Sequence, residues 1–307
     1  MKNKLSGTLA LLFATVIWGS AFIAQSVGMD HIGPMTFQAS RCGLGALFLI
    51  PIIFLFEKDK KQYFKNWADA KLWKTGFFCG TALFVAAGLQ QVGLVYTSAG
   101  KAGFITTLYI IFVPIAGIFF RRRVGGMVWL AAALAAVGMY LLCMTESFAL
   151  SSGDTLVFLC AVVFTAHIMV IDHYADHVDG VIVSCIQFTI AGLVCTVGAL
   201  LFEEPTFAAL GDGIIALLYA GVMSCGIAYT LQIVGQKGVN PTVAALILSL
   251  ESVVATVAGV VAFKIGLLKT DQTMTGRQIA GCVLVFVGVI LVQLPWDKWF
   301  VRKVNNE

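Results

Sequence analysis

The segment that most constrains the architecture of this protein reads Thr97-Ser-Ala-Gly-Lys-Ala-Gly-Phe-Ile-Thr-Thr-Leu-Tyr109-Ile-Ile-Phe-Val-Pro114. A related segment follows later, Val239-Asn-Pro-Thr-Val-Ala-Ala-Leu-Ile-Leu-Ser-Leu-Glu251-Ser-Val-Val-Ala-Thr256, and adding 142 to the first numbering gives the second without a gap. Each copy begins with a turn of small residues and continues as a long apolar helix with one polar residue at mid-length. That residue is Tyr109 in the first copy and Glu251 in the second. Glu251, a lone carboxylic acid in an apolar helix, is the residue that most needs an explanation.

Composition indicates the class of protein. The chain has 307 residues, of which 59% are hydrophobic and 12% charged, and its mean hydropathy is +0.92. A soluble domain carries about a quarter charged residues. The deficit predicts an integral membrane protein. The net charge of +4 gives no support for nucleic-acid binding, because the basic residues lie mainly in short loops between apolar runs.

Ten apolar runs of about 20 residues, the length that crosses a ~30 Å hydrocarbon core as a helix, divide the chain. They cover residues 7–28, 34–56, 73–96, 98–120, 126–144, 153–172, 181–202, 213–235, 241–263 and 276–295. The first run is too long for the apolar part of a signal peptide, and no small-x-small cleavage site follows it. The sequence therefore predicts an all-α integral membrane protein with ten transmembrane helices in a single membrane domain.

The repeat extends beyond the opening segment. Adding 146 places Ser6-Gly7 on Ser152-Gly153, and adding 150 places Gly126 on Gly276. Helices one to five thus reappear as helices six to ten, in two five-helix repeats that cover residues 1–147 and 148–307. Because five is odd, the second repeat enters the membrane from the opposite side. Such inverted repeats are typical of secondary transporters.

Lysine and arginine residues predict the orientation of the helices. If both termini lie in the cytoplasm, the inner segments hold fifteen of these residues and the outer segments three. We therefore expect a multi-pass protein of the cytoplasmic (inner) membrane with both termini cytoplasmic. The basic stretch 58–74 also carries Trp67 and Trp73, so it is either a helix on the anionic membrane surface or a solvated loop.

Two charged residues lie well inside apolar runs. Glu251 is ten residues past Pro241, about 15 Å deep at 1.5 Å per residue, and Arg41 is seven residues past Pro34, about 10 Å deep. A carboxylate near the midplane is costly unless it faces protein, water or a partner. Glu251 is therefore a proton carrier, a ligand for a cationic substrate group, or a protonated acid bonded to a neighbouring helix. Arg41 keeps its charge and needs an acceptor, which is a substrate carboxylate, Glu251 or a backbone carbonyl.

Other polar and aromatic residues near mid-membrane are candidates for the lining of a cavity. The full set of predicted substrate-binding residues is Trp18, Arg41, Gln90, Tyr109, Gln232 and Glu251. Gln90 and Gln232 match across the repeat, so they either line the cavity or bond helices together. His167 joins Glu251 as a candidate for proton coupling, although a lone histidine in an apolar helix is more often a packing residue.

The chain carries no motif of an enzyme. GxSxG, HExxH and phosphate-binding loops are missing, and no two carboxylates are paired. Eight cysteines lie in apolar runs without a CxxC pair, which predicts packing residues and neither disulfides nor metal ligands. We expect no catalytic residue, no metal and no cofactor. The expected partners are a small-molecule substrate and membrane lipid, with a proton as candidate coupling ion.

Three motifs stand in a specific order along the ten helices. They are Trp18-Gly19-x-x-Phe22 in the first helix, Thr97-Ser98-Ala99-Gly100-x-Ala102 leading to Pro114, and Leu250-Glu251 in the ninth. In this order the chain resembles the drug/metabolite transporter (DMT) superfamily, EamA type, over nearly its whole length. The resemblance implies export of small metabolites, often amino acids, through a central cavity lined by both halves. Ser252 stands where that family often has proline, which leaves the substrate subgroup open.

The leading prediction is a secondary transporter that works by alternating access; the alternatives are a lipid scramblase and a membrane-embedded enzyme. The substrate is predicted near the midplane between helices one, four and nine, with Arg41 toward the outside. An acid and a guanidinium at that separation suit a zwitterion, so an amino acid is the first candidate. The fourth helix is predicted to bend at Pro114, and the ninth, with Thr256 there, to be straighter.

Overall fold

The protein is described by a computed structural model that covers residues 2–56, 67–97, 99–121, 124–144, 151–174, 177–267 and 273–294. Over these residues it is helical, and ten helices are long and apolar enough to cross a membrane. The predicted all-α membrane architecture with ten spans is therefore confirmed. The basic stretch 58–74, predicted to be either a surface helix or a solvated loop, lies outside the described residues up to residue 66, and its residues 70–74 belong to the first turns of the third span.

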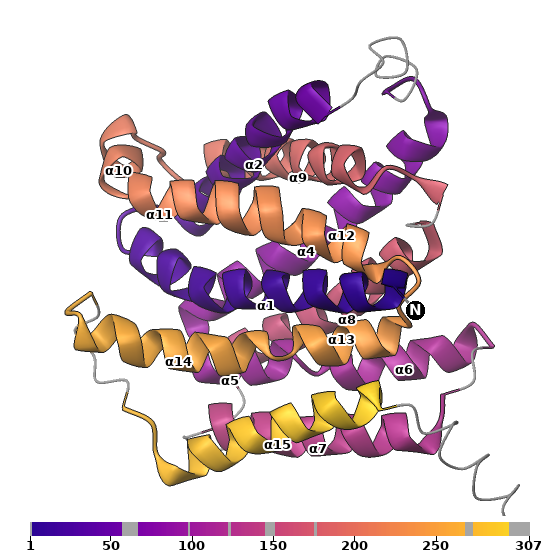
Figure 1. Cartoon of the computed structure of the whole chain (residues 1–307). Helices are drawn as coiled ribbons and strands as arrows, with labels where there is room; N and C mark the ends of the chain where they lie inside the picture. The colour runs from indigo at the N-terminus through magenta and orange to yellow at the C-terminus, as the bar shows by residue number, and fades with distance from the viewer. Residues whose placement is uncertain are drawn as a thin grey trace, which may run out of the picture.

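The described residues form fifteen helical segments, and all of them except the short α10 belong to the ten spans (Figure 1). In chain order these are α1 (Lys2–Met29), α2 (Pro34–Phe56), α4 (Ala70–Tyr96), α5 (Ala99–Thr106), α6 (Tyr109–Phe119), α7 (Gly126–Cys143), α8 (Ser152–Tyr174), α9 (Gly180–Phe202), α10 (Phe207–Asp212), α11 (Ile214–Leu218), η2 (Tyr219–Tyr229), α12 (Thr230–Gln236), α13 (Pro241–Leu248), α14 (Glu251–Lys264) and α15 (Gly276–Gln293).

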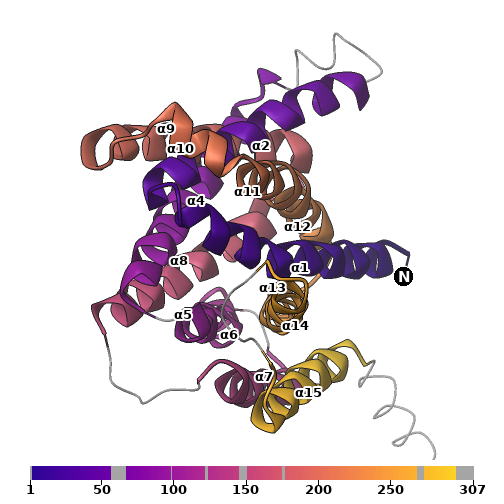
Figure 2. The ribbon, with the colours of Figure 1, turned by 90° about the vertical axis from the view of Figure 1, so that its left-hand side faces the viewer.

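Contacts between the helices come in matched pairs. α1 packs against α14 as α8 packs against α6, and α4 packs against α8 as η2 and α12 pack against α1. α7 and α15 pack on each other at one edge of the bundle (Figures 1 and 2). This pairing is what a two-fold axis between the halves requires. The inverted orientation of the two repeats in a membrane stays a prediction.

Glycine pairs set two of the closest helix crossings. A Cβ atom on Gly153 would lie 2.6 Å from the carbonyl oxygen of Gly93, and a Cβ atom on Gly7 would lie 2.6 Å from that of Gly235. The two crossings are repeat equivalents, because adding 146 to 7 gives 153 and adding 142 to 93 gives 235. Small residues therefore bring α8 against α4, and α1 against α12, at backbone contact.

The fourth and ninth spans are both interrupted near their middle. α5 ends at Thr106 and α6 begins at Tyr109, while α13 ends at Leu248 and α14 begins at Glu251. The two interruptions occupy equivalent positions in the repeats. Tyr109 and Glu251 are thus the first residues of the second halves of their spans.

A hydroxyl side chain bonds to the backbone at each interruption. Thr107 Oγ1 donates to the carbonyl of Gly103 at 3.0 Å, and Ser249 Oγ donates to that of Leu246 at 2.8 Å. Such bonds compete with the backbone ladder and bend helices. The interruption of the fourth span lies before Pro114, which α6 includes, and the ninth span, predicted to be straighter, is interrupted at the equivalent position. The bend at Pro114 itself stays a prediction.

The eighth span differs from its repeat equivalent. Its central part, η2, is a π-helix of 11 residues, whereas the equivalent third span, α4, is α-helical throughout. π-helical segments are rare and often occur at functional sites. η2 places Ser224 and Tyr229 toward the interior of the bundle, where both are buried.

Candidate functional site

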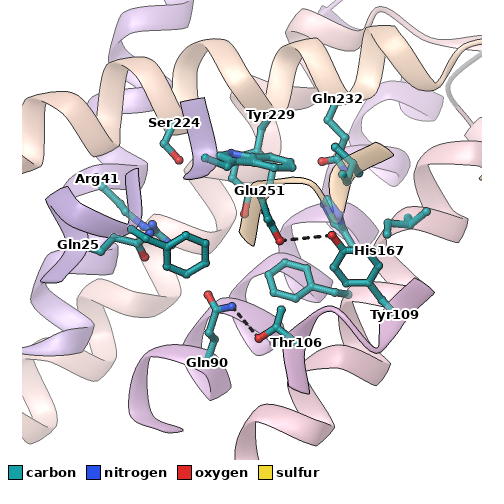
Figure 3. Close-up of a pocket in the computed structure, with 15 residues that line it drawn as sticks. Gln25, Arg41, Gln90, Thr106, Tyr109, His167, Ser224, Tyr229, Gln232 and Glu251 are labelled. Atoms are coloured by element: carbon teal, nitrogen blue, oxygen red, sulfur yellow. Dashed lines mark hydrogen bonds between the residues drawn. The ribbon is translucent and has the colours of Figure 1, made fainter. Parts of the chain in front are cut away.

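A cavity of about 60 Å³ lies inside the bundle, among spans of both halves (Figure 3). Its lining residues are Trp18, Phe22, Gln25, Arg41, Gln90, Thr106, Tyr109, Phe164, His167, Ile168, Ser224, Tyr229, Gln232, Leu248 and Glu251. All six residues predicted to bind substrate line this one cavity, as does His167. The structure thus brings the whole predicted set together, and the function of each residue stays a prediction.

Glu251 and Tyr109 face each other across the cavity. The Tyr109 hydroxyl donates to Oε1 of Glu251 at 3.3 Å (Figure 3). The two residues are repeat equivalents and begin α14 and α6, so the pair joins the two interrupted spans. The start of a helix favours a negative charge, which suits a carboxylate at the first residue of α14.

Arg41 reaches the cavity from α2 and is 4% exposed. Its Nε donates to Oε1 of Gln38 at 2.6 Å, one turn earlier on the same helix. Within the part of the chain that the structure describes, no carboxylate lies within 4.0 Å of its guanidinium. The alternative that Arg41 and Glu251 neutralise each other in an ion pair is therefore not the arrangement found. Two separate charged side chains line one buried space.

Aromatic rings form one wall of the cavity. The rings of Trp18 and Tyr229 meet edge to face with centroids 4.6 Å apart, and Tyr229 also contacts the rings of Phe188 and His167. Edge-to-face contacts of this kind hold the rings in fixed orientations. Tyr229 therefore links α1, α8 and α9 at the level of the site.

Two further polar side chains of the site, Gln90 and His167, have hydrogen-bond partners of their own. Gln90 Nε2 donates to Thr106 Oγ1 at 3.1 Å, which ties α4 to α5. The Nε2 atom of His167 lies 3.1 Å from Oε1 of Gln187, the repeat equivalent of Arg41. Gln90 therefore lines the cavity and also bonds two helices together, so both predicted alternatives hold for this side chain.

Sequence reasoning missed several lining residues, among them Gln25, Thr106 and Ser224. The sequence could have predicted Gln25, because Trp18, Phe22 and Gln25 follow i, i+4, i+7 spacing and so share one helix face. Ser224 had none, since a π-helix shifts the positions that face inward. Figure 3 shows Gln25 beside Arg41, at the end of the cavity away from Gln232.

Comparison with known proteins gives consistent matches. The EamA-like transporter family matches this chain twice, over residues 5–144 and 151–294. A protein of Archaeoglobus fulgidus described as an uncharacterized transporter is 30% identical over 298 residues, covering 95% of this chain and 87% of the relative. The uncharacterized transporter YoaV of Bacillus subtilis is 20% identical over 305 residues, covering 96% and 98%. A protein of known crystal structure shares the fold with a TM-score of 0.75 at 17% identity, covering 94% of this chain and 96% of that one.

Proposed function

Because this chain belongs to the EamA-like transporter family, a group within the DMT superfamily, we propose that it is a secondary carrier that exports small zwitterionic metabolites. Amino acids are the first candidates. The carrier would work by alternating access, with the cavity of Figure 3 as its substrate site. The membership supports a membrane transporter, and the substrate class is our proposal.

The observation that carries the proposal is the pair of separate charges in the cavity. A buried arginine and a buried carboxylic acid usually pair with each other, because an unpaired buried charge is costly. Here Glu251 accepts only from Tyr109, and Arg41 donates only to Gln38, among the described residues. A zwitterion supplies what both lack, with its amine toward Glu251 and its carboxylate toward Arg41.

The size of the cavity supports alternating access. About 60 Å³ holds a few water molecules, whereas sites for small molecules typically measure roughly 300–1,000 Å³. The conformation is therefore a compact one, and the helices must separate for a substrate to enter. The interruptions beside Tyr109 and Glu251 are natural positions for that movement, as in other carriers with discontinuous helices.

Glu251 is also the proposed proton carrier. An acid that releases its proton when an amine binds would link substrate movement to proton movement in the opposite direction. His167 lines the same cavity and is the second candidate. A catalytic role has no support, since the family and its relatives are named as transporters.

A lipid scramblase is the second candidate, because a groove of about 620 Å³ opens between α1, α11, η2 and α14. Its lining is mainly aliphatic, and the hydroxyls of Ser20 and Tyr219 bond each other at 2.6 Å. A lipid headgroup needs a polar track, so this groove suits hydrocarbon better than a headgroup. Movement of fluorescent phospholipid in vesicles containing the protein would favour the scramblase over the carrier.

The proposed substrate class is tested by ligand-induced stabilisation of the purified protein. A ligand that binds only the folded state raises its apparent stability in proportion to occupancy. We expect amino acids to raise the melting temperature, and the matching amines and carboxylates with one charged group to raise it far less. Equal shifts for single-charge analogues would rule out a site that reads both groups.

The orientation in the membrane is a separate proposal, supported by the fifteen-to-three distribution of basic residues. With both termini in the cytoplasm, an Asn305→Cys variant should not react with a membrane-impermeant thiol reagent added to intact cells. Reaction after the cells are opened is the positive control. Efficient labelling from outside would reverse the orientation.

A further inference from the structure

Several buried polar atoms near the cavity lack a hydrogen-bond partner. Two of them, within the described chain, are Nε1 of Trp18 and Oε1 of Gln25 on α1. Six others lie on α8, α9 and α12: Nδ1 of His167, Oγ of Ser184, Nε2 of Gln187, Oε1 of Gln232, and both Oε1 and Nε2 of Gln236. The side chains that carry these six atoms are each at most 3% exposed. A buried polar atom left unpaired destabilises the folded protein, so six on three adjacent helices need an explanation.

The residues that carry these six atoms form a polar strip with two arms, one on α12 and one on α9. Gln232 and Gln236 are four residues apart on α12, and Ser184 and Gln187 are three apart on α9, so each pair shares a helix face. α12 contacts both α9 and α8, and His167 of α8 bonds Gln187. The strip begins at the cavity, because His167 and Gln232 line it.

Both arms of the strip run toward the same end of the bundle. Gln236 is the last residue of α12, and Ser184 lies one turn from the start of α9. At that start, a Cβ atom on Gly180 would lie 3.0 Å from Ile233 of α12. Lys237 Nζ donates to the carbonyl of Val178 at 2.8 Å, just beyond the strip. We call this place the Lys237 end.

The other repeat offers a direct comparison. Subtracting 146 places Ser184 and Gln187 on Gln38 and Arg41, and subtracting 142 places Gln232 on Gln90. In that repeat the side chains are paired, Arg41 with Gln38 at 2.6 Å and Gln90 with Thr106 at 3.1 Å. Among the described residues of the first repeat, Nε1 of Trp18, Oε1 of Gln25 and Oε1 of Gln91 also lack a partner. The two repeats therefore differ at the equivalent positions, which are bonded in the first repeat and unpaired in the strip on α8, α9 and α12.

We propose that this strip lines a water-accessible path between the central cavity and the Lys237 end. Water that enters when the helices separate there satisfies the unpaired atoms, so the free energy lost by burying them in the compact state is regained on opening. At the equivalent positions of the other repeat no such gain is available, because Gln38, Arg41 and Gln90 are already bonded. The path rests on the proposed carrier function, which requires the cavity to meet water.

The test is the reaction of an introduced thiol with a small water-soluble methanethiosulfonate reagent, in the purified full-length protein. Ser184→Cys changes one atom of the strip. Ala191→Cys is the matched control, since Ala191 lies on the same face of α9, is 0% exposed and belongs to an apolar cluster. Both are made in a Cys185→Ala background, so that the neighbouring native thiol does not contribute, and peptide mass spectrometry locates the label.

We expect Ser184→Cys to react at least roughly tenfold faster than Ala191→Cys, because access to water and to the reagent controls the rate for thiols of similar type. Gln236→Cys is the second variant and should also react faster than the control if Ser184→Cys does not fold. Equal slow reaction of all three overturns the path. The thiol assay needs no substrate. It can therefore disprove the water path while ligand binding supports the carrier function, and it can support the path while ligand binding contradicts the carrier function.

Discussion

Replacing Glu251 by glutamine is expected to reduce transport by roughly 30-fold to several-thousand-fold, since removing one partner of a buried charged contact costs about 2–5 kcal/mol. Glutamine keeps the shape and still accepts from the Tyr109 hydroxyl. The loss should therefore come from the missing charge and not from unfolding. The measurement is export or counterflow of an amino acid that stabilises the purified protein.

Arg41→Gln should cause a loss of similar size, because it removes the guanidinium proposed to bind the substrate carboxylate. Among the described residues no carboxylate pairs with Arg41, so the substitution leaves no buried acid unpaired. Glu204→Gln is the matched control: it removes an exposed carboxylate outside the cavity and should transport normally. Melting temperatures of all variants separate loss of function from loss of fold. Normal transport by both cavity variants would show that the substrate site is elsewhere.

The second large effect is expected on stability. In Gly153→Ala the new methyl group would lie 2.6 Å from the carbonyl oxygen of Gly93, and it would also meet the backbone of Tyr96. Because backbone atoms cannot rotate away, α8 and α4 must separate. Overpacking of this kind costs about 1–3 kcal/mol, and we expect a clear drop in melting temperature.

Gly88→Ala is the control for that result. Gly88 lies in α4, the helix against which Gly153 packs, and a Cβ atom there has nothing within 4 Å. Replacing a mid-helix glycine by alanine at an open site should raise stability by about 0.5–1 kcal/mol. If Gly153→Ala and Gly88→Ala melted at the same temperature, the glycine crossing would not limit the packing of the helices.

The composition of the site could be predicted because depth in a membrane follows from residue number. A helix rises by a fixed 1.5 Å per residue, so Trp18, Tyr109 and Glu251 had to lie near one level. The repeat then placed Tyr109 and Glu251 on equivalent helices, and the structure joins them by a hydrogen bond. The ten spans were predictable for a related reason, since the thickness of the bilayer sets their length.

The details that the sequence did not predict depend on local backbone conformation and on side-chain rotamers. Pro114 suggested a bend in one half only, whereas both spans are interrupted at equivalent points, beside Thr107 and Ser249. The π-helix η2 has no periodic signature in sequence, so Ser224 could not be assigned to the cavity. Pairing of Arg41 with Gln38 depended on side-chain rotamers, which the sequence leaves open.

The measurement that most directly tests the central claim is calorimetric binding of three ligands to three proteins. The ligands are an amino acid, its matching amine and its matching carboxylate, and the proteins are the wild type, Glu251→Gln and Arg41→Gln. We predict that the wild type prefers the amino acid to both analogues. Glu251→Gln should lose the advantage of the amino acid over the carboxylate, and Arg41→Gln its advantage over the amine. If both variants kept the wild-type order of affinities, Glu251 and Arg41 would not be the groups that bind the substrate.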